Sequence, residues 1–428
     1  MDKRTVRIGV IGCGTVGSAV IKSLIKNRKS LREKTGIEFA VAGICDKDIR
    51  KRRLYPSLFT QNPEEIVKST EIDIVVELIG GTDVAFEVIK RAMANGKSVV
   101  TANKAIISEK GRELFRIAEE KNLHIGFEAS VAGAIPVIKT IKESFVGNNI
   151  LKIFGILNGT TNYILTEMFK NSINFSTALS MAKKLGYAEA DPSLDIKGID
   201  TAHKLSILST LAFRKYIHWK DMYVEGIEKI EPLDISFTAE FGYRIKLLAV
   251  AKRDRETLDV RIHPTLLPSR HLLSFVDGVY NAVYLEGDMF GRALLYGEGA
   301  GGPAAASAVI SDIVDIGKKL RHNNLPYKTI ASEDRKLKLL PVEDIQTRYY
   351  FRFTALDKPG VLAGIAKVLG RYNISIASVI QKEESPEKAV PILMLTHRAK
   401  ELSVRRAIKE INKLPFIKKP TVLLRVEE

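Results

Sequence analysis

Residues 6–31, VRIGVIGCGTVGSAVIKSLIKNRKSL, decide the fold of the first part of this 428-residue chain. VRIGVI (6–11) is typical of a buried strand, GCGTVG (12–17) is a G-x-G-x-x-G turn, and helical spacing follows. In such turns the first glycine permits a tight bend, the second admits a pyrophosphate, and the third allows close helix packing. The helix N-terminus offers N–H groups to phosphates. Against a purely structural turn, we favour a dinucleotide site formed by Gly12, Gly14, Thr15, Val16 and Gly17.

The second expected strand, FAVAGICD (39–46), ends where an adenosine ribose would lie. Asp46 would accept a hydrogen bond from a 2′-hydroxyl and favour NAD. Lys47 and the basic run 50–53 would instead attract a 2′-phosphate and favour NADP. The sequence leaves both cofactors open.

Strands and helices alternate from residue 72 to residue 130, which predicts a parallel sheet. Ligands of such sheets lie beyond the carboxyl ends of the strands. Five residues fall at such ends: Gly80, Gly81, Thr82, Asn103 and Lys104. Of these, Gly80, Gly81, Thr82 and Lys104 are candidates for cofactor contact. The alternative for Lys104 is an ordinary loop lysine.

The pattern changes after residue 138. ILKIFGILNGTTNYILTEMF (150–169) predicts a strand, a polar turn and a helix, with Thr160 or Thr161 as the helix N-cap. The polar turn is also a candidate for substrate contact.

The stretch GYAEADPSLDIKGIDTAHKLSIL (186–208) carries Glu189, Asp191, Asp195 and Asp200, followed by Lys204. We expect a helix from about Asp195, which places Asp200 and Lys204 on one face at i, i+4 spacing. Apolar flanks indicate that this helix is buried, and a buried acid–lysine pair is either a structural ion pair or a functional one. A divalent metal is less favoured because no known metal-loop spacing is present.

The last 81 residues predict the order β-α-β-β-α-β, a ferredoxin-like module, after a polar linker. This tail is basic, with 16 basic and 8 acidic residues from Arg348 to Glu428. No nucleic-acid motif accompanies the charge, so we expect a solvated surface and no nucleic-acid partner.

Composition excludes several classes of protein. Only Cys13 and Cys45 are present, so a disulfide scaffold is excluded and a reducing, cytoplasmic location is expected. No apolar run approaches 18 residues, and the N-terminal stretch has no small-residue cleavage site, so neither a membrane span nor a signal peptide is expected.

The motifs taken together resemble homoserine dehydrogenases over residues 6–325. The shared stretches, in family order, are GCGTVG, VVELIGG, TANK, EASVAGAIPVI, GILNGTTNYIL, EADPSLDIKGIDTAHKLSIL and GAGGPAAASAV. In the tail, DKPGVL followed by NISI resembles an ACT domain. The resemblance implies an α/β protein with a Rossmann-type nucleotide-binding domain (1–127), an α+β catalytic and dimerisation domain (128–325, of which 303–325 partly returns to the nucleotide domain), a linker (326–347) and a ferredoxin-like ACT domain (348–428).

The resemblance also implies reversible oxidation of L-homoserine to L-aspartate 4-semialdehyde with NAD or NADP, in threonine, methionine and isoleucine biosynthesis. Lys204 matches the acid/base lysine, with Asp200 beside it, and Lys104 matches a second lysine near the nicotinamide. The family pattern implies these further roles: substrate binding by Glu189, Tyr187, Thr160 and Asp195; cofactor binding by Gly301 and Gly302; and a monovalent cation, sodium, held mostly by carbonyls of Glu128, Val131, Gly133 and Ile135.

For the ACT domain, the resemblance implies an amino-acid effector, with threonine the leading candidate, near Gly360 and Asn373. A homodimer or homotetramer is expected.

Which of Lys204 and Lys104 transfers the proton stays open. The alternative to an active dehydrogenase is an amino-acid-sensing protein whose dehydrogenase half is inactive. An aspartate-semialdehyde dehydrogenase is excluded because both cysteines lie in the nucleotide half, which leaves no nucleophilic cysteine.

Overall fold

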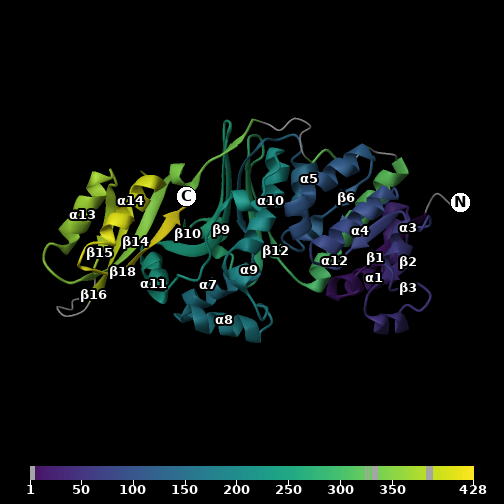
Figure 1. The fold of residues 1–428 in the computed structure, drawn as a ribbon, viewed down its shortest axis with the longest axis horizontal. Coiled ribbons are helices and arrows are strands. Elements are labelled where there is room, and N and C mark those ends of the chain that lie inside the picture. Colours follow the sequence, from purple (N-terminus) through teal and green to yellow (C-terminus); the bar gives the residue numbers. More distant parts are fainter. Residues whose placement is uncertain (1–4, 323–324, 326, 330–335, 382–388) are drawn as a thin grey trace. The chain divides into compact units, whose positions relative to one another are not determined.

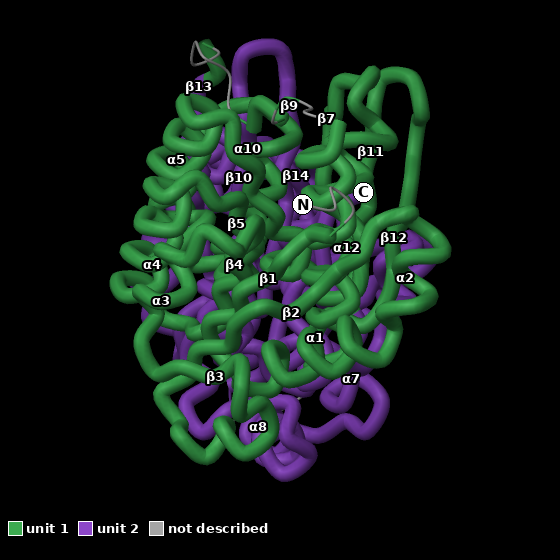
Figure 2. The backbone as a smooth tube through the Cα atoms, turned by 90° about the vertical axis from the view of Figure 1, so that its right-hand side faces the viewer, with its two compact units in different colours: residues 1–153, 203–221, 281–337 green, residues 154–202, 222–280, 338–428 purple. Residues whose placement is uncertain are grey.

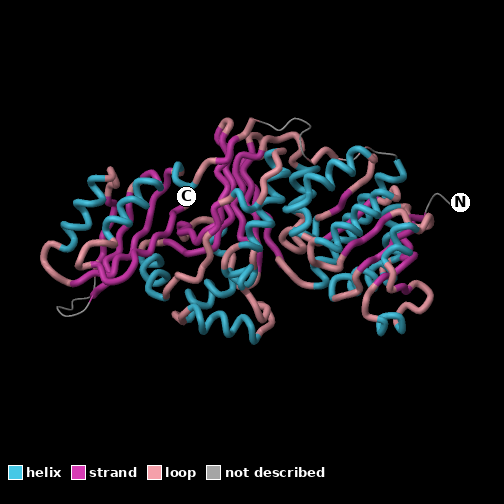
Figure 3. Tube along the Cα trace, in the orientation of Figure 1, coloured by secondary structure: helices cyan, strands magenta, loops and turns pink. Residues whose placement is uncertain are grey.

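The structure, a computed structural model, describes residues 5–322, 325, 327–329, 336–381 and 389–428 (Figure 1). The chain divides into two compact units (Figure 2). Unit 1 comprises residues 1–153, 203–221 and 281–337, and unit 2 comprises residues 154–202, 222–280 and 338–428. Both units combine helices and strands (Figure 3). Over the described ranges, no helix is long and apolar enough to cross a membrane.

Unit 1 is built on a six-stranded parallel sheet in the order β3-β2-β1-β4-β5-β6. This order and the helices between the strands are those of a dinucleotide-binding fold, which confirms the expected fold class for this region. The elements are β1 (Thr5–Ile11), α1 (Thr15–Lys26), α2 (Arg28–Thr35), β2 (Glu38–Cys45), η1 (Ile49–Arg53), β3 (Phe59–Thr60), α3 (Pro63–Lys68), β4 (Ile74–Glu77), α4 (Asp83–Ala94), β5 (Ser98–Thr101), α5 (Lys104–Glu120) and β6 (Ile125–Gly126).

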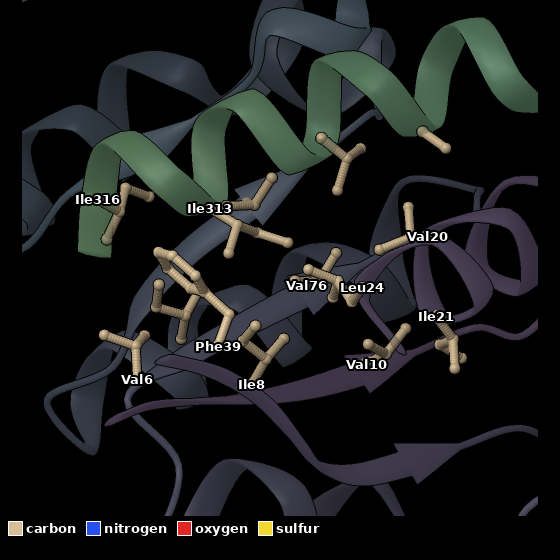
Figure 4. Close-up of a cluster of buried hydrophobic side chains, with 14 of the residues drawn as sticks. Val6, Ile8, Val10, Val20, Ile21, Leu24, Phe39, Val76, Ile313 and Ile316 are labelled. Carbon is tan, nitrogen blue, oxygen red and sulfur yellow. The ribbon is translucent and has the colours of Figure 1, made fainter. Parts of the chain in front are cut away.

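Alternating residues of β1 point to opposite faces of this sheet. Ile8 and Val10 pack with Val20 and Leu24 of α1 and with Ile313 of α12 (Gly302–His322) (Figure 4). A Cβ on Gly9, between them, would lie 2.5 Å from the side chain of Ile66 in α3. The strand therefore separates α1 and α12 on one face from α3 on the other.

The rest of unit 1 comes from three separate parts of the chain. After β6 come η2 (Glu128–Ser130), α6 (Val137–Lys139) and a π-helical turn, η3 (Thr140–Ser144). The later elements are most of α10 (Ile199–Phe213), η4 (Trp219–Asp221), β11 (Tyr280–Gly287), β12 (Gly291–Glu298) and α12. Two of these elements, α10 and β11, begin in unit 2, because the boundary falls after Ala202 in α10 and after Tyr280 in β11. Strand β7 (Ile150–Ile156) also crosses the boundary, which falls after Ile153.

In unit 2, six strands follow the order β9-β10-β18-β14-β16-β15. The elements before the C-terminal module are α7 (Gly159–Asn171), α8 (Phe175–Lys184), α9 (Ser193–Ile196), β8 (Tyr223–Val224), α11 (Pro232–Glu240), β9 (Tyr243–Asp254), β10 (Thr257–Pro268), η5 (Leu272–Phe275), β13 (Lys338–Leu339) and η6 (Val342–Asp344). The long strands β9 and β10 form an antiparallel pair, and β13 pairs in parallel with β10.

The C-terminal module has the expected β-α-β-β-α-β order. Its elements are β14 (Gln346–Leu356), α13 (Val361–Arg371), β15 (Ile376–Ile380), β16 (Ala389–Thr396), the short β17 (Ala399–Lys400), α14 (Glu401–Ile411) and β18 (Ile417–Val426). Strand order β18-β14-β16-β15 within the module is ferredoxin-like, and the two helices share one apolar core with the strands. The turn KEESPEK (382–388) lies outside the described residues.

Buried ion pairs join this module to the rest of unit 2. Arg352 of β14 donates to Asp234 of α11 from Nε (2.7 Å) and Nη2 (3.1 Å), and the Tyr350 hydroxyl donates to the same carboxylate (3.1 Å). Asp234 is fully buried and the Arg352 side chain is 5% exposed. A charge pair without water is stable only with such complete hydrogen bonding, so this contact fixes β14 against α11.

Replacing Arg352 with methionine should lower the free energy of unfolding by about 3–5 kcal/mol, because Asp234 would be left buried without its charge partner. Denaturant unfolding followed by circular dichroism measures the change. The matched control is Arg371→Met, which removes an arginine from an exposed pair with Glu410 and should cost less than about 1 kcal/mol. Equal losses in the two variants would contradict the role given to the buried pair.

Candidate functional site

In the glycine turn of unit 1, two of the three glycines have no room for a side chain, and the third has open space around it. Gly12 has φ +101°, and a Cβ there would lie 2.6 Å from the carbonyl group of Leu78. A Cβ on Gly17 would lie 1.9 Å from the carbonyl oxygen of Gly12. A Cβ on Gly14 would meet nothing within 4 Å. Glycine is therefore required by packing at Gly12 and Gly17, whereas the space at Gly14 is free for a ligand, as a pyrophosphate requires.

Two helix N-termini adjoin this turn. α1 begins at Thr15, and α12 begins at Gly302. A Cβ added to Gly302 would lie 3.0 Å from Cγ2 of Thr15, so the two helix starts are close together. Gly301, just before α12, has φ +124°. The first turn of each helix carries N–H groups without helical partners, and these favour a negative group. Gly301 and Gly302, which we expect to contact the cofactor, thus lie next to the start of α1.

Asp46, the expected ribose acceptor, also braces the turn. Its Oδ2 accepts from the Cys13 N–H (2.6 Å) and its Oδ1 from the Asp48 N–H (2.8 Å). In the basic run, Arg50 donates to Asp48 at 2.8 and 2.9 Å, and this hydrogen bonding holds the pKa of Asp48 below its usual value. The acid and the basic run thus occupy the same end of β2, and NAD and NADP both stay open.

The carboxyl ends of β4 and β5 are tied together by side chains. The buried Glu77 accepts from the Thr101 hydroxyl (2.6 Å) and from the Ile79 N–H (2.8 Å), and burial raises its pKa. Asn103 donates from Nδ2 to the Gly81 carbonyl (2.5 Å) and caps α5 through Oδ1. These bonds place Gly80, Gly81 and Thr82 beside the start of α5, which is Lys104. Sequence reasoning missed Glu77, although an acid at the end of an apolar strand was a visible signal.

One hydrogen bond joins α5 to α10. Ser108, one turn after Lys104, forms a hydrogen bond with Nδ1 of His203, which directly precedes Lys204. Both members of this bond are buried. Unit 1 thus joins the helix that begins at Lys104 to the helix that carries Lys204, although the two lysines are 100 positions apart in the sequence.

In unit 2, Asn158 organises the acidic residues. Its side-chain nitrogen donates to Oδ1 of Asp195 (2.7 Å) and to Oδ2 of Asp200 (2.9 Å). Its side-chain oxygen accepts from the Thr161 N–H (2.8 Å), so Asn158 is the N-cap of α7, and the expectation of a threonine N-cap is wrong. Asparagine at this position serves the two carboxylates as well as the helix, which neither threonine could do.

Thr160 contributes to the same turn through Oγ1, which donates to the Tyr187 carbonyl (2.6 Å). Lys246 also holds the start of α7, because its ammonium donates to Oδ1 of Asn162 (3.1 Å) and to Oδ1 of Asp277 (3.2 Å). Burial lowers the pKa of Lys246 to about 8. Tyr187 and Glu189 are exposed in the following loop.

The expectation of one helix from about Asp195 is wrong. α9 ends at Ile196, and α10 begins at Ile199. Gly198, between them, has φ +80°, a conformation that breaks a helix and suits glycine. Asp200 and Lys204 do share α10 at i, i+4 spacing, and Asp200 is buried. The bend lets Asp195 and Asp200, on different helices, reach the same asparagine amide.

The loop from Glu128 to Ile135 is tightly held in unit 1. Gly133 has φ +57°, and a Cβ there would lie 2.7 Å from the Gly299 carbonyl group. The Glu128 carboxylate accepts the Ile138 and Lys139 N–H groups, each at 2.8 Å, so this side chain caps a helix. Burial and Asp312 raise the pKa of Glu128 to about 7. Within the described ranges, no group of three or more His, Cys, Asp or Glu side chains is placed to hold a metal ion.

A cavity of about 600 Å³ lies in unit 1 between the later part of α5, β6 and α12. Of the predicted site residues, only Glu128 lines it among the residues that the structure describes. The cavity therefore gives no support to the predicted substrate site.

In the C-terminal module, Gly360 precedes α13 with φ +89°, and a Cβ there would meet nothing within 4 Å. Asn373, just after α13, has φ +57° and donates its N–H to the Gly370 carbonyl (3.0 Å). The two predicted effector residues thus flank a single helix, one at each end.

Comparison with known proteins gives three family models and many relatives. The model "Homoserine dehydrogenase" matches residues 136–314, "Homoserine dehydrogenase, NAD binding domain" matches 12–128, and "ACT domain" matches 349–416. Homoserine dehydrogenases of Helicobacter pylori and Neisseria gonorrhoeae are 43% and 41% identical, covering 99% of this chain and 100% and 99% of theirs. A solved homoserine dehydrogenase from Thiobacillus denitrificans has a TM-score of 0.93 and 41% identity, covering 99% of this chain and 98% of that one.

A more distant solved structure bears on the cofactor. A hyperthermophilic archaeal homoserine dehydrogenase in complex with NADPH is 29% identical, with a TM-score of 0.63, covering 75% of this chain and 99% of that one. Together with the matched NAD-binding model, this relative supports NAD(P) binding.

Adding one methyl group to Gly14 should affect cofactor binding, whereas adding it to Gly17 should affect stability. Gly14→Ala should leave the melting temperature unchanged but weaken NAD(P)H binding at least tenfold, because the added methyl occupies the phosphate space. Gly17→Ala should destabilise the protein by about 1–3 kcal/mol, because the methyl overlaps the Gly12 carbonyl. Thermal unfolding and cofactor fluorescence titration measure the two effects. If Gly14→Ala bound the cofactor like the original protein, the phosphate would not lie at this turn.

Proposed function

The chain belongs to the homoserine dehydrogenase family, as an NAD(P)-binding oxidoreductase with a C-terminal ACT domain, and from this premise we propose how its residues carry out the reaction and its control. We propose that the reaction interconverts L-homoserine and L-aspartate 4-semialdehyde in threonine, methionine and isoleucine biosynthesis, in the cytoplasm. The observation that supports the proposal is the buried bond between Ser108 of α5 and His203 of α10, since Lys104 is one turn before Ser108 and Lys204 directly follows His203.

The nicotinamide, when bound, accepts a hydride from the alcohol carbon or donates one to the aldehyde carbon. The residues of this chain supply the remaining requirements. In the reducing direction a proton must reach the carbonyl oxygen as the hydride arrives, and in the oxidising direction a base must remove the hydroxyl proton. We assign this proton transfer to Lys204, acting chiefly as a positioned acid, with Lys104 as the second lysine near the nicotinamide.

Asp200 supports this assignment because it is one helical turn before Lys204. Its carboxylate is held by the Asn158 amide (2.9 Å), so its orientation is fixed before substrate arrives. A carboxylate held in one orientation on the same helix face can orient the lysine amine toward the reacting oxygen.

The four-carbon amino acid also needs groups that recognise its ammonium and carboxylate. We assign the ammonium to Glu189, whose carboxylate is exposed, with Tyr187, Thr160 and Asp195 as further substrate residues. The hydrogen bond from Thr160 to the Tyr187 carbonyl supports a common role for this pair.

For the cation, we propose sodium at the carbonyls of Glu128, Val131, Gly133 and Ile135. Carbonyl oxygens are hard ligands that suit such a cation, and the Glu128 carboxylate is already engaged by the Ile138 and Lys139 N–H groups. The Glu128 carbonyl accepts one hydrogen bond, from the Val131 N–H (3.3 Å), and its second lone pair would face the cation. We also propose that the division into domains follows residues 1–127, 128–325, 326–347 and 348–428, and that the protein is a homodimer or homotetramer.

The activity is tested by following NAD(P)H absorbance with L-homoserine and, in reverse, with L-aspartate 4-semialdehyde. We expect turnover in both directions with at least one of the two cofactors. Absence of turnover with either cofactor would overturn the proposed reaction.

Replacing Lys204 with alanine should lower kcat at least about 100-fold, because the proton donor is lost. Cofactor affinity should change little, since the lysine is assigned to the substrate. Steady-state kinetics and cofactor fluorescence measure the two quantities. Lys184→Ala removes an exposed lysine at the end of α8 and should have the kcat of the original protein. A Lys204→Ala variant with normal kcat would refute the assignment.

For the C-terminal module, we propose that threonine binds near Gly360 and Asn373 and inhibits the enzyme. Asn373→Gly keeps the left-handed backbone conformation but removes the amide, so basal activity should persist while threonine inhibition weakens at least tenfold. Inhibition curves with and without the substitution provide the measurement. Unchanged inhibition in the variant would place the effector elsewhere.

A further inference from the structure

Four side chains of unit 1 meet around the bond between α5 and α10. Nδ1 of His203 bonds to Oγ of Ser108, and Nε2 of His203 faces Oε1 of Glu109 at 4.0 Å. The His203 ring lies against the Trp219 ring, with centroids 4.9 Å apart, and the Trp219 indole donates to Glu109 (3.3 Å). The two ring nitrogens of His203 therefore have different neighbours.

The backbone of α5 is held at the same point. The Tyr216 hydroxyl donates to the Ser108 carbonyl (2.6 Å), and burial, with the nearby Glu109 charge, raises the pKa of Tyr216 to about 12. Ser108 is 1% exposed and His203 is 8% exposed. Buried polar groups of this kind are costly unless paired, so the contact has one strongly preferred arrangement.

Each partner of this bond is close in sequence to one of the lysines. Lys104 and Ser108 are at i, i+4 on α5, and Lys204 directly follows His203 on α10. Any slide or rotation of one helix against the other changes the separation of the lysines and breaks the Ser108–His203 bond.

We propose that Ser108 and His203 are positioning residues, which act by fixing the separation of Lys104 and Lys204. The inference rests on the proposed roles of the two lysines. Neither Ser108 nor His203 is assigned any contact with substrate or cofactor. Their effect is on the turnover step, since a misplacement of about 1 Å at the reacting groups can cost on the order of 100-fold in rate.

The test uses two substitutions of His203 that preserve different nitrogens. His203→Asn keeps a hydrogen-bonding group near the position of Nδ1 and so retains the bond to Ser108. His203→Gln places its amide near the position of Nε2 and loses that bond. We expect His203→Asn to have a kcat within threefold of the original protein, and His203→Gln and Ser108→Ala to lose about tenfold or more. The KM for homoserine and the Kd for NAD(P)H should stay within twofold in all three.

Ser206→Ala is the matched control. Ser206 is buried on α10, three residues after His203, and its hydroxyl donates to the Ile217 carbonyl, not to α5. Its loss should lower the melting temperature as much as the loss of Ser108 but leave kcat within threefold. The double variant Ser108→Ala/His203→Gln should be no slower than the slower single variant, because both remove the same bond.

Several results would overturn the inference. Equal kcat for His203→Asn and His203→Gln, or an equal loss of kcat in Ser206→Ala and Ser108→Ala, would show that only general stability is involved. Lys104→Ala and Lys204→Ala, assayed alongside, separate the two claims. Normal kcat in the lysine variants would refute the proposed roles of the lysines, whereas impaired lysine variants with normal Ser108→Ala and His203→Gln would refute the positioning role alone.

Discussion

The geometry of the site depends on one helix, α10. Its backbone hydrogen bonds fix Asp200 and Lys204 one turn apart. His203, the residue before Lys204, bonds to Ser108 of α5 within unit 1. Asp200 accepts a hydrogen bond from the Asn158 amide within unit 2. All four of these polar residues are buried, so each bond favours one orientation of its own part of the helix.

The elements that form through local pattern were predictable from the sequence. The strand β1, the glycine turn and α1 follow from an apolar run, three glycines and helical spacing, and the structure has them at Thr5–Ile11, Gly12–Gly17 and Thr15–Lys26. The ferredoxin-like order of the C-terminal module was predictable for the same reason. Each of these signals lies within a few residues of the element that it specifies.

The contacts within the site were less predictable because they join distant residues. The bond between Ser108 and His203 spans 95 positions, and those of Asn158 to the two aspartates span 37 and 42. The break at Gly198 was missed because a glycine within a helical pattern is often tolerated, and only its positive φ shows that the helix stops. The family resemblance named Asp195 and Asp200, but not the asparagine that holds them.

Strand β18 has a consequence for how the chain is made. It is the last strand in sequence, yet in unit 2 it lies between β10 and β14, pairing in parallel with the first and antiparallel to the second. During synthesis on the ribosome, β10 must wait for about 150 further residues before this neighbour emerges. Until then Thr265 and Leu266, the residues of β10 that pair with β18, lack this partner, although the earlier strand β8 can already pair with Arg261 and Ile262. Unpaired strand edges are surfaces on which nascent chains aggregate, so chaperone protection of this part of β10 matters throughout that interval.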